Sequence, residues 1–344
     1  MKTGINKILA GVFVVIGITG YTQDIHFSQF DETPLQLNPA NAGVQYETRF
    51  IANYKSQWQS VNAPFKTFAV SGDARLLKKK RTNLGIGLDV FSDNAGSGQY
   101  KTTQANLSIS GIVSINDASR ISGGIMLGYA QHSLNRGSYT WGNQYNGLAY
   151  DGTMASGEPT ASNNFGMLDL GAGVAYTYGS KEQYMTANNA KRITIGVSVF
   201  HPNQPAYSYY SNGTKLYMKY VFHGDAALGI KNTNLVLKPS YIIFIQGPAK
   251  EITPGMTFQY ILQDASKYTG NKKFSAVSVG GYYRAKDAFI AVAKFDFNTY
   301  AIGFSYDVNL SKLRTVSSTR GGFEITLRAG FNSARGSGSK AMFK

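Results

Sequence analysis

The sequence predicts an all-β protein: a transmembrane antiparallel β-barrel of about 14 strands (roughly 12–16), with a short N-terminal periplasmic or plug segment. Three observations support this prediction. The composition is poor in charge and rich in Tyr, Phe and Gly, an export signal comes first, and polar and apolar residues alternate through most of the remaining chain. By these signals the chain divides into a signal peptide (1–22), the N-terminal segment (23–48), the barrel (49–331) and a C-terminal tail (332–344).

The composition separates this chain from ordinary soluble domains and from bundles of membrane helices. Charged residues make up 15% of the chain, against about 25% in a typical soluble domain, and aromatic residues make up 13%. The mean hydropathy of −0.20 is too low for a helical membrane bundle. With 38 Gly and no Cys, the chain suits a protein with one lipid-facing surface and needs no disulfide in an oxidising compartment.

The net charge of +15 raises nucleic-acid binding as one interpretation. The basic residues are scattered, however, and no basic helix, zinc finger or aromatic RNA-binding signature accompanies them. We therefore expect no nucleic-acid partner. We interpret the charge as solvated loops, a hydrated lumen, or loops that face anionic lipid headgroups.

Residues 1–22 have the organisation of a signal peptide. Lys2 and Lys7 form a basic region, residues 8–18 form an apolar run, and small residues suited to cleavage precede Gln23. The apolar run is too short to cross a bilayer as a helix, which needs about 20 residues. A retained helical anchor is the alternative interpretation. A mature protein that lies in a membrane must therefore cross it with strands.

From residue 49 onward the dominant pattern has a period of two. Near the end of the chain, Glu324, Thr326 and Arg328 alternate with apolar residues, as in a strand with one polar and one apolar face. Many such segments are about 10 to 14 residues long, nearer the 9–11 that cross a bilayer at a tilt than the five or six of soluble strands. We expect strands at 49–58, 65–75, 83–93, 101–114, 119–132, 165–178, 191–200, 217–230, 234–245, 250–262, 274–284, 287–297, 299–307 and 321–331.

The lengths of the connections predict how the barrel is oriented. Bacterial barrels have long outer loops and short periplasmic turns, so the longest gaps, 133–164 and 201–216, should face outward. Both gaps follow odd-numbered strands, which places the chain before the first strand on the periplasmic side. The short gap 115–118 agrees with this orientation, whereas the longer inner gaps 179–190 and 263–273 fit it less well.

A basic run, Lys78-Lys79-Lys80-Arg81, falls on the inner side in this orientation. It is either a contact for a periplasmic partner or a solvated turn, and we favour the solvated turn. Residues after 335 form a short basic tail. No long linker or tandem repeat indicates a second domain.

The sequence offers little for catalysis or for metal binding. None of the four His residues pairs with another at metal-ligand spacing, and without Cys a zinc site would need scattered residues. His132 precedes Ser133, but neighbours on a strand point to opposite faces and cannot form a nucleophile–base pair. The Gly336–Ser339 stretch is similar to a nucleophile motif but lies in the tail, not between a strand and a helix. We expect no enzyme activity, no cofactor, no metal and no catalytic residue.

Aromatic residues are concentrated in the two longest connections. Tyr and Trp give a large amphipathic contact area at low entropic cost, which suits the binding of a protein partner. The alternatives are an aromatic girdle at the membrane interface, or loops that pack on each other and cap the pore. The candidate partner-binding residues are Tyr139, Trp141, Tyr145, Tyr150, Tyr207, Tyr209 and Tyr210.

The N-terminal segment carries a resemblance to a known family. The sequences HFSQF at 26–30 and TPLQLNPANAG at 33–43 resemble the opening of the PorP/SprF family of type IX secretion system membrane proteins. The run Tyr54–Trp58 is similar to the first strand of that family, which usually has Arg where this chain has Lys55. Two further stretches, Tyr306 to Asn309 and Gly321 to Ile325, look like the family's closing strands.

The resemblance implies a function that composition and periodicity do not. It implies an outer-membrane barrel of gliding or secreting bacteria that supports the secretion or surface anchoring of a partner adhesin by binding its C-terminal sorting domain. It also implies contact with other type IX secretion components and with outer-membrane lipid, and no catalysis. The alternative function is an outer-membrane pore or a channel for hydrophobic solutes.

The N-terminal segment itself has two interpretations. The Asn38-Pro39 step predicts a turn into the first strand. Fully extended, its roughly 20 residues reach up to about 70 Å, enough to fold back into a lumen. It is therefore either a plug, with an apolar-aromatic face made of His26, Phe27, Phe30 and Leu35, or a periplasmic handle for other secretion components.

Overall fold

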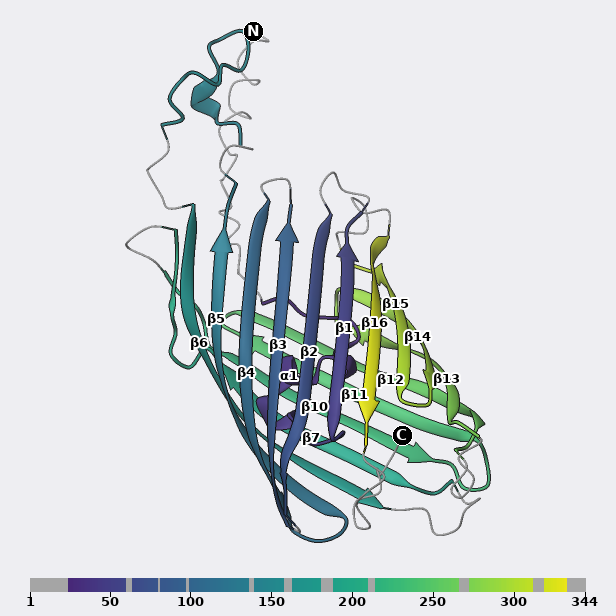
Figure 1. Cartoon of the computed structure of the whole chain (residues 1–344). Coiled ribbons are helices and arrows are strands. Elements are labelled where there is room, and N and C mark those ends of the chain that lie inside the picture. Colours follow the sequence, from purple (N-terminus) through teal and green to yellow (C-terminus); the bar gives the residue numbers. More distant parts are fainter. Residues whose placement is uncertain are drawn as a thin grey trace, which may run out of the picture.

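Alternating lumen-facing and lipid-facing residues fold this chain into a closed barrel of fourteen antiparallel strands, as the sequence predicted (Figure 1). The computed structural model describes residues 24–59, 64–79, 81–96, 99–135, 139–157, 163–180, 188–209, 214–265, 272–311 and 319–332. The predicted signal peptide and most of the predicted tail lie outside these residues. The barrel strands are β1 (Thr48–Gln57), β2 (Phe65–Lys78), β3 (Thr82–Ala95), β4 (Tyr100–Ser114), β5 (Ser119–Ser133), β6 (Asn164–Ser180), β7 (Lys191–Phe200), β10 (Lys219–Gly229), β11 (Leu235–Gln246), β12 (Ala249–Gln263), β13 (Ser275–Arg284), β14 (Ala288–Phe297), β15 (Tyr300–Asn309) and β16 (Arg320–Phe331).

The remaining elements are short. Three of them precede the first strand: η1 (Phe30–Glu32), α1 (Pro34–Leu37) and η2 (Pro39–Asn41). A fourth, η4 (Gly142–Gln144), lies in the connection between β5 and β6, and the two-stranded hairpin of β8 (Ala206–Tyr207) and β9 (Thr214–Lys215) lies between β7 and β10. None of the helices among the described residues is long and apolar enough to span a membrane.

The strands are inverted relative to those of a soluble domain, with polar residues inside and apolar residues outside. On β4, Ser108 and Ser110 face the lumen and are fully buried, whereas Leu107 is 39% and Ile109 is 41% exposed on the outer surface. An apolar outer band and a polar interior are the pattern of a barrel in a bilayer. The alternation was readable from the sequence because lipid selects the residue type at every second position.

The barrel closes between its first and last strands. β1 pairs antiparallel with β16 from Thr48–Phe331 to Gln57–Gly322 without a register shift. Closure leaves no unpaired strand edge, which matters because an unpaired backbone amide in lipid costs several kcal/mol. The expected strand 217–230 begins later, at Lys219, because Leu216 is buried against Ala130 and Met167 instead of joining the wall.

The two mouths of the barrel differ in their connections. The mouth at the ends of β1, β3, β5 and β7 carries residues 134–163 and 201–218, and we call it the long-loop mouth (Figure 1). The opposite mouth, where β1 begins, we call the turn mouth. Since bacterial barrels carry their long loops on the cell exterior, we assign the long-loop mouth to the outside and the turn mouth to the periplasm.

Candidate functional site

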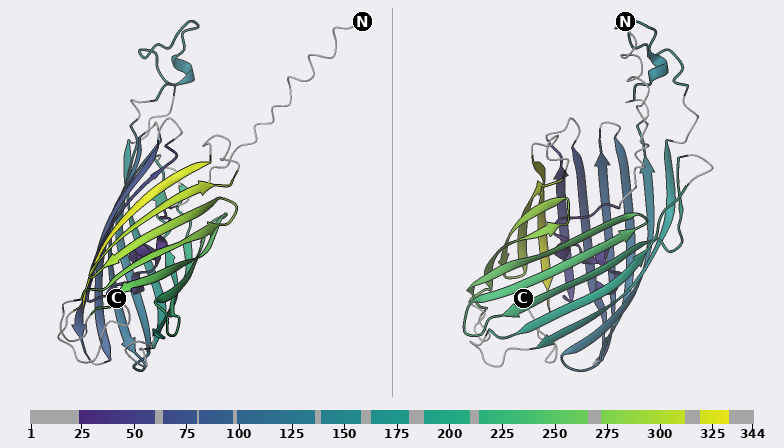
Figure 2. Two further views of the ribbon diagram at one scale, coloured as in Figure 1. Left: turned by 90° about the vertical axis from the view of Figure 1, so that its right-hand side faces the viewer. Right: turned by 180° about the vertical axis from the view of Figure 1, so that it is seen from behind.

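The N-terminal segment lies inside the barrel. Residues Asp24–Gly43, which we call the plug, run through the lumen from one mouth to the other (Figure 2). At the long-loop mouth the Asp24 amide donates to Oε1 of Gln246 at 3.1 Å, and at the turn mouth the Gly43 amide donates to Oδ2 of Asp73 at 2.8 Å. Of the two interpretations left open by the sequence, the structure shows the plug: the segment folds back from the start of β1, where Gly43 lies, through the lumen to Asp24 at the other mouth.

The plug contacts every strand of the wall. Most of its residues between Phe27 and Gly43 are buried. Its hydrogen bonds and close approaches reach from Lys55 on β1, whose Nζ donates to the His26 carbonyl at 2.8 Å, round to Glu324 on β16. The contacting wall residues are Lys55, Asp73, Gly85, Ser110, Gly124, Val174, Ser198, His223, Gln246, Glu251, Arg284, Lys294, Asp307 and Glu324, one from each strand.

The Asn38-Pro39 turn fixes the middle of the plug. Oδ1 of Asn38 accepts a hydrogen bond from the Ala40 amide at 2.9 Å and thereby caps η2. Its Nδ2 donates to the carbonyls of Val174 at 3.0 Å and Val197 at 3.3 Å, on two neighbouring strands. Asn38 is fully buried. The Asn38 side chain thus stabilises the turn and also attaches it to the barrel wall. The Asn38-Pro39 motif therefore holds the plug in place inside the lumen.

Glycines in the wall allow the plug to approach it closely. A Cβ added at Gly85 would lie 2.1 Å from the Ala42 carbonyl oxygen, and one at Gly124 would lie 2.5 Å from the Ala40 nitrogen. Both neighbours are backbone atoms that cannot move aside. The Gly content of the strands is therefore partly a requirement of the plug.

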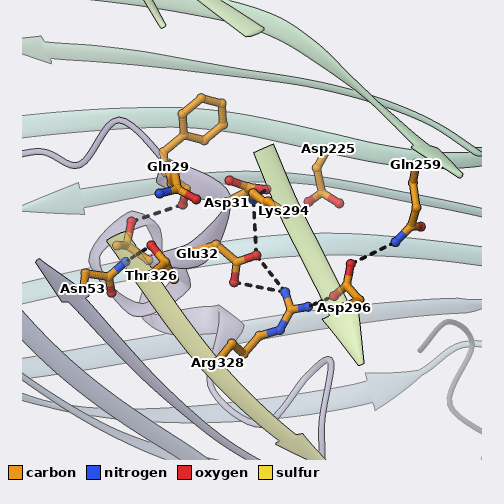
Figure 3. Close-up of polar contacts among 12 residues, drawn as sticks. Gln29, Asp31, Glu32, Asn53, Asp225, Gln259, Lys294, Asp296, Thr326 and Arg328 are labelled. Carbon is orange, nitrogen blue, oxygen red and sulfur yellow. Dashed lines mark hydrogen bonds and ion pairs between the residues drawn. The ribbon is translucent and has the colours of Figure 1, made fainter. Parts of the chain in front are cut away.

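A buried ion network joins the centre of the plug to the wall (Figure 3). Both carboxylate oxygens of Glu32 accept from Nη1 of Arg328, at 2.8 and 3.0 Å, and Oε1 also accepts from Nζ of Lys294 at 3.2 Å. The Arg328 guanidinium donates from Nη2 to Asp296 at 2.7 Å, and Lys294 also pairs with Asp31. Each charge has a partner of opposite sign, as buried charges require.

A second polar network holds the plug nearer the long-loop mouth. The Ser28 amide donates to Oε2 of Glu324 at 2.7 Å, and the Ser28 hydroxyl donates to Asp307 at 2.8 Å. Arg284 donates to the same Asp307 carboxylate at 3.2 Å and to the Ser28 hydroxyl at 3.2 Å. Lys55 on β1 is 2% exposed, and its Nζ donates to the plug backbone.

The first described residue of the plug is bound in a latch at the long-loop mouth. Nε2 of His201 lies 2.7 Å from Asp24, and its Nδ1 lies 2.6 Å from the fully buried Asp169. Lys219 lies 3.3 Å from the same Asp24 carboxylate. Burial alone would lower the pKa of His201, but Asp24 and Asp169 outweigh it and raise the pKa to about 9. Burial would also raise the pKa of Asp24, but Lys219 and His201 hold it well below its usual range.

The latch should open at alkaline pH. Because the pKa of His201 is raised from about 6.5 to about 9, its contribution is complete below pH 6.5 and is lost as the pH rises through 9. We expect the protection factors of the amides of residues 24–30, that is, the intrinsic exchange rate divided by the observed rate at the same pH, to fall between these values in detergent-solubilised protein. His201→Gln should remove this pH dependence. Protection factors at these residues that are equal at pH 7 and pH 10 in the parent protein would contradict the latch.

The predicted loop residues divide into two groups. Tyr207 and Tyr209 fold back over the lumen and pack edge-on against Phe165, with ring centroids 5.5 and 4.8 Å apart, and the Tyr207 hydroxyl lies 2.6 Å from that of Tyr100. His132 stacks on the same Phe165 ring. For these two tyrosines the structure shows loop packing at the mouth. Tyr210 lies outside the described residues.

The other predicted loop residues belong to a folded projection above the barrel. We call residues 139–157 the knob (Figure 1). Gln144 is buried at the centre of the knob. Its backbone carbonyl accepts a hydrogen bond from the Asp151 amide at 2.8 Å. Tyr139 packs against Trp141 at 5.7 Å between centroids. Tyr145 and Tyr150 form an isolated β-bridge and are more than half exposed.

The tip of the knob is apolar and exposed. Leu148, which lies in the sequence between the two bridged tyrosines, is 91% exposed, and Met154 of the same knob is 38% exposed. Sequence reasoning identified the tyrosines but missed Leu148, because one apolar residue in a polar loop gives no periodic signal.

The predicted plug residues do not form a single face but pack against different parts of the wall, from Gly87 on β3, which Leu35 approaches, to Tyr282 on β13. Phe30 packs against Tyr282 at 4.8 Å between ring centroids, and Phe27 and Leu35 are buried. Nε2 of His26 lies 3.3 Å from Glu251. Sequence reasoning missed the polar plug residues that bind the wall, namely Asp24, Ser28, Gln29, Asp31 and Glu32.

Among the described residues there is no group of three or more His, Asp or Glu side chains that could hold a metal ion.

Comparison with known proteins identifies one family. The model of the family described as "Type IX secretion system membrane protein PorP/SprF" matches residues 19–329, which is most of the chain. No curated protein matches the chain.

Solved structures that resemble it are outer-membrane barrels of low sequence identity. They include the "CymD monoaromatic hydrocarbon channel" (11% identity, TM-score 0.43, covering 88% of this chain and 93% of that one). A Pseudomonas aeruginosa FadL homologue gives 11% identity and a TM-score of 0.48, covering 86% of this chain and 92% of that one. The P. putida toluene transporter TodX gives 11% identity and a TM-score of 0.43, covering 86% and 93%.

Proposed function

The chain belongs to the PorP/SprF family of type IX secretion system membrane proteins, and on that premise we propose that it anchors a secreted partner adhesin at the cell surface. It is an outer-membrane protein of a secretion system. The proposed step is binding of the adhesin's C-terminal sorting domain by the long-loop mouth. This would support gliding or secretion by holding the adhesin after export.

The knob is the observation that carries this proposal. Its tip presents Tyr145, Leu148 and Tyr150 to solvent from a loop held in shape by Gln144 and the η4 turn. Exposed aromatic and aliphatic side chains on a rigid support are favoured anchors of protein interfaces, because little entropy is lost when they bind. A tip that points away from the barrel suits a partner arriving from outside.

The proposed role is binding rather than catalysis. The four His residues all have structural partners: His26 lies beside Glu251, His132 packs among the mouth tyrosines, His201 holds Asp24 and His223 contacts Asn38. A plug that contacts every strand also favours an anchoring role over the alternative of an open pore or solute channel. Other components of the secretion system are further proposed partners.

Replacing the knob tip should release the adhesin. We expect the triple variant Tyr145→Ser, Leu148→Ser and Tyr150→Ser to lose most surface-bound adhesin to the medium, because interface anchors of this kind each contribute about 2 kcal/mol or more. Immunoblotting of cells and of culture medium would measure this. The amount of barrel in the outer membrane should not change.

The matched control is Leu310→Ser. Leu310 is 52% exposed and follows β15 at the same mouth, but lies outside the knob. It should retain the adhesin as the parent does. Full retention in the triple variant would show that the knob is not the binding surface.

A further inference from the structure

A cavity lies in the lumen on the periplasmic side of the plug. Its volume is about 180 Å³, and its lining extends from Phe30 and Glu32 of the plug to Glu47 and Asn332 at the turn mouth. At about 30 Å³ for each water molecule, it holds roughly six waters. It is large enough for a few polar side chains of another molecule, but not for a folded domain.

The walls of this cavity carry more cations than the plug neutralises. Some of the lining cations are paired: Arg49 with Asp73 at 2.7 Å, and Arg192 with Asp225 at 3.1 Å. Lys294 and Arg328 bind the plug carboxylates described above. The lining residues that form no ion pair with any carboxylate in the described part of the chain are Arg75, Arg120 and Lys238.

The three unpaired cations come from different parts of the wall. Arg75 is on β2, Arg120 on β5 and Lys238 on β11. Within the described part of the chain, the Arg75 guanidinium donates to the backbone carbonyls of Gly43 and Val44, at 2.7 and 2.6 Å. Its charge is repelled by Arg120 and attracted by Glu47 and Asp73. The carboxylates of Glu47 and Asp225 also line the cavity. Seven Arg and Lys side chains and five Asp and Glu side chains line the cavity, and this excess of positive charge creates a potential that attracts an anion.

The basic run of the sequence lies at the same end of the barrel. Residues 78–81 connect β2 to β3 at the turn mouth, a few residues beyond Arg75. Residue 80 and the side chain of residue 78 lie outside the described part of the chain. A basic connection beside a basic cavity would steer an acidic partner toward that mouth.

We propose that this cavity is a docking site for an acidic peptide segment of a periplasmic protein. Carboxylates of the segment would pair with Arg75, Arg120 and Lys238. The strand wall separates the cavity from the bilayer, and its lining reaches the turn mouth at Glu47 and Asn332, so a soluble peptide fits it better than a lipid headgroup. The site is at the opposite mouth from the knob and is independent of adhesin binding.

A fluorescent hexaglutamate peptide tests the proposal on the purified full-length protein in detergent. Fluorescence anisotropy should show saturable binding that weakens with salt, because charge pairs near a surface are screened. The double variant Arg120→Gln and Lys238→Met should bind about ten-fold or more weakly, as expected for the loss of hydrogen bonds between charged groups. Lys250→Gln, which removes an exposed cation at the long-loop mouth, should bind as the parent does.

Three outcomes would overturn the proposal. The first is unchanged hexaglutamate binding in the double variant, and the second is equally tight binding of a neutral Gly-Ser hexapeptide. The third is displacement of the fluorescent hexaglutamate by phosphatidylglycerol vesicles but not by unlabelled hexaglutamate. Heat-modifiable migration in gels shows whether the double variant is folded. If it is unfolded, the single variants Arg120→Gln and Lys238→Met carry the test.

Discussion

Arg328→Met is expected to destabilise the folded protein by about 3–5 kcal/mol, the usual cost of removing one partner from a buried ion pair. The guanidinium of Arg328 serves two carboxylates at once, Glu32 on the plug and Asp296 on β14. Without it, Glu32 would have to share Lys294 with Asp31, and Asp296 would lose its ion pair and keep the hydrogen bond from Gln259. Urea unfolding in lipid vesicles, followed by Trp fluorescence, would measure the change in the free energy of unfolding.

A double variant shows whether this cost comes from the network. Adding Glu32→Gln to Arg328→Met removes one of the two carboxylates that lose the Arg328 charge, so part of the lost stability should return. Arg328→Lys keeps the charge but not the two-pronged geometry, and should cost less than Met. Additive losses in the double variant would show that Glu32 and Arg328 do not act together.

The barrel could be predicted from the sequence because lipid imposes a local rule on every strand. On β4, for example, the residue type alone indicates that Leu107 faces the lipid and Ser108 faces the lumen. The number of strands was confirmed for the same reason. Their ends were less predictable, and β10 starts two residues late because Leu216 packs inside the lumen.

The position of the plug could not be predicted in this way. Ser28 and Glu32 are residue types that also suit a solvated handle. Their partners, Glu324 and Arg328, are each 296 residues away in the sequence. The turn at Asn38-Pro39 was visible, but its contacts with β6 and β7 depend on the closed barrel. A plug and a handle therefore have the same local pattern.

The loop tyrosines show the same limit. Tyr145 and Tyr207 both lie in long connections between strands, yet one is exposed on the knob and the other packs against Phe165. Along a strand, the alternation of side chains decides whether a residue faces the lumen or the lipid. In a long loop, only tertiary contacts decide whether a side chain is buried or exposed. The basic cavity could not be predicted from the sequence for a related reason. Arg75, Arg120 and Lys238 lie on strands that are far apart in the sequence, and they line one cavity only in the closed barrel.

Deleting the plug should open the barrel. A fourteen-stranded barrel is wider than the eight-stranded ones whose lumen is filled by their own side chains. Here the segment Asp24–Gly43 occupies that space. Without it, wall charges such as Glu324 and Arg328 would face water, which would hydrate them and leave a continuous polar passage. The matched control replaces residues 145–150 of the knob, outside the lumen.

Single-channel conductance in a planar bilayer tests most directly the claim that the plug closes the lumen. The intact protein and the 145–150 control should give no sustained conductance, and the protein lacking residues 24–43 should give stable openings. If the deletion variant does not insert, the intact protein alone decides the question. A stable, selective conductance from the intact protein would contradict the account and favour the channel alternative.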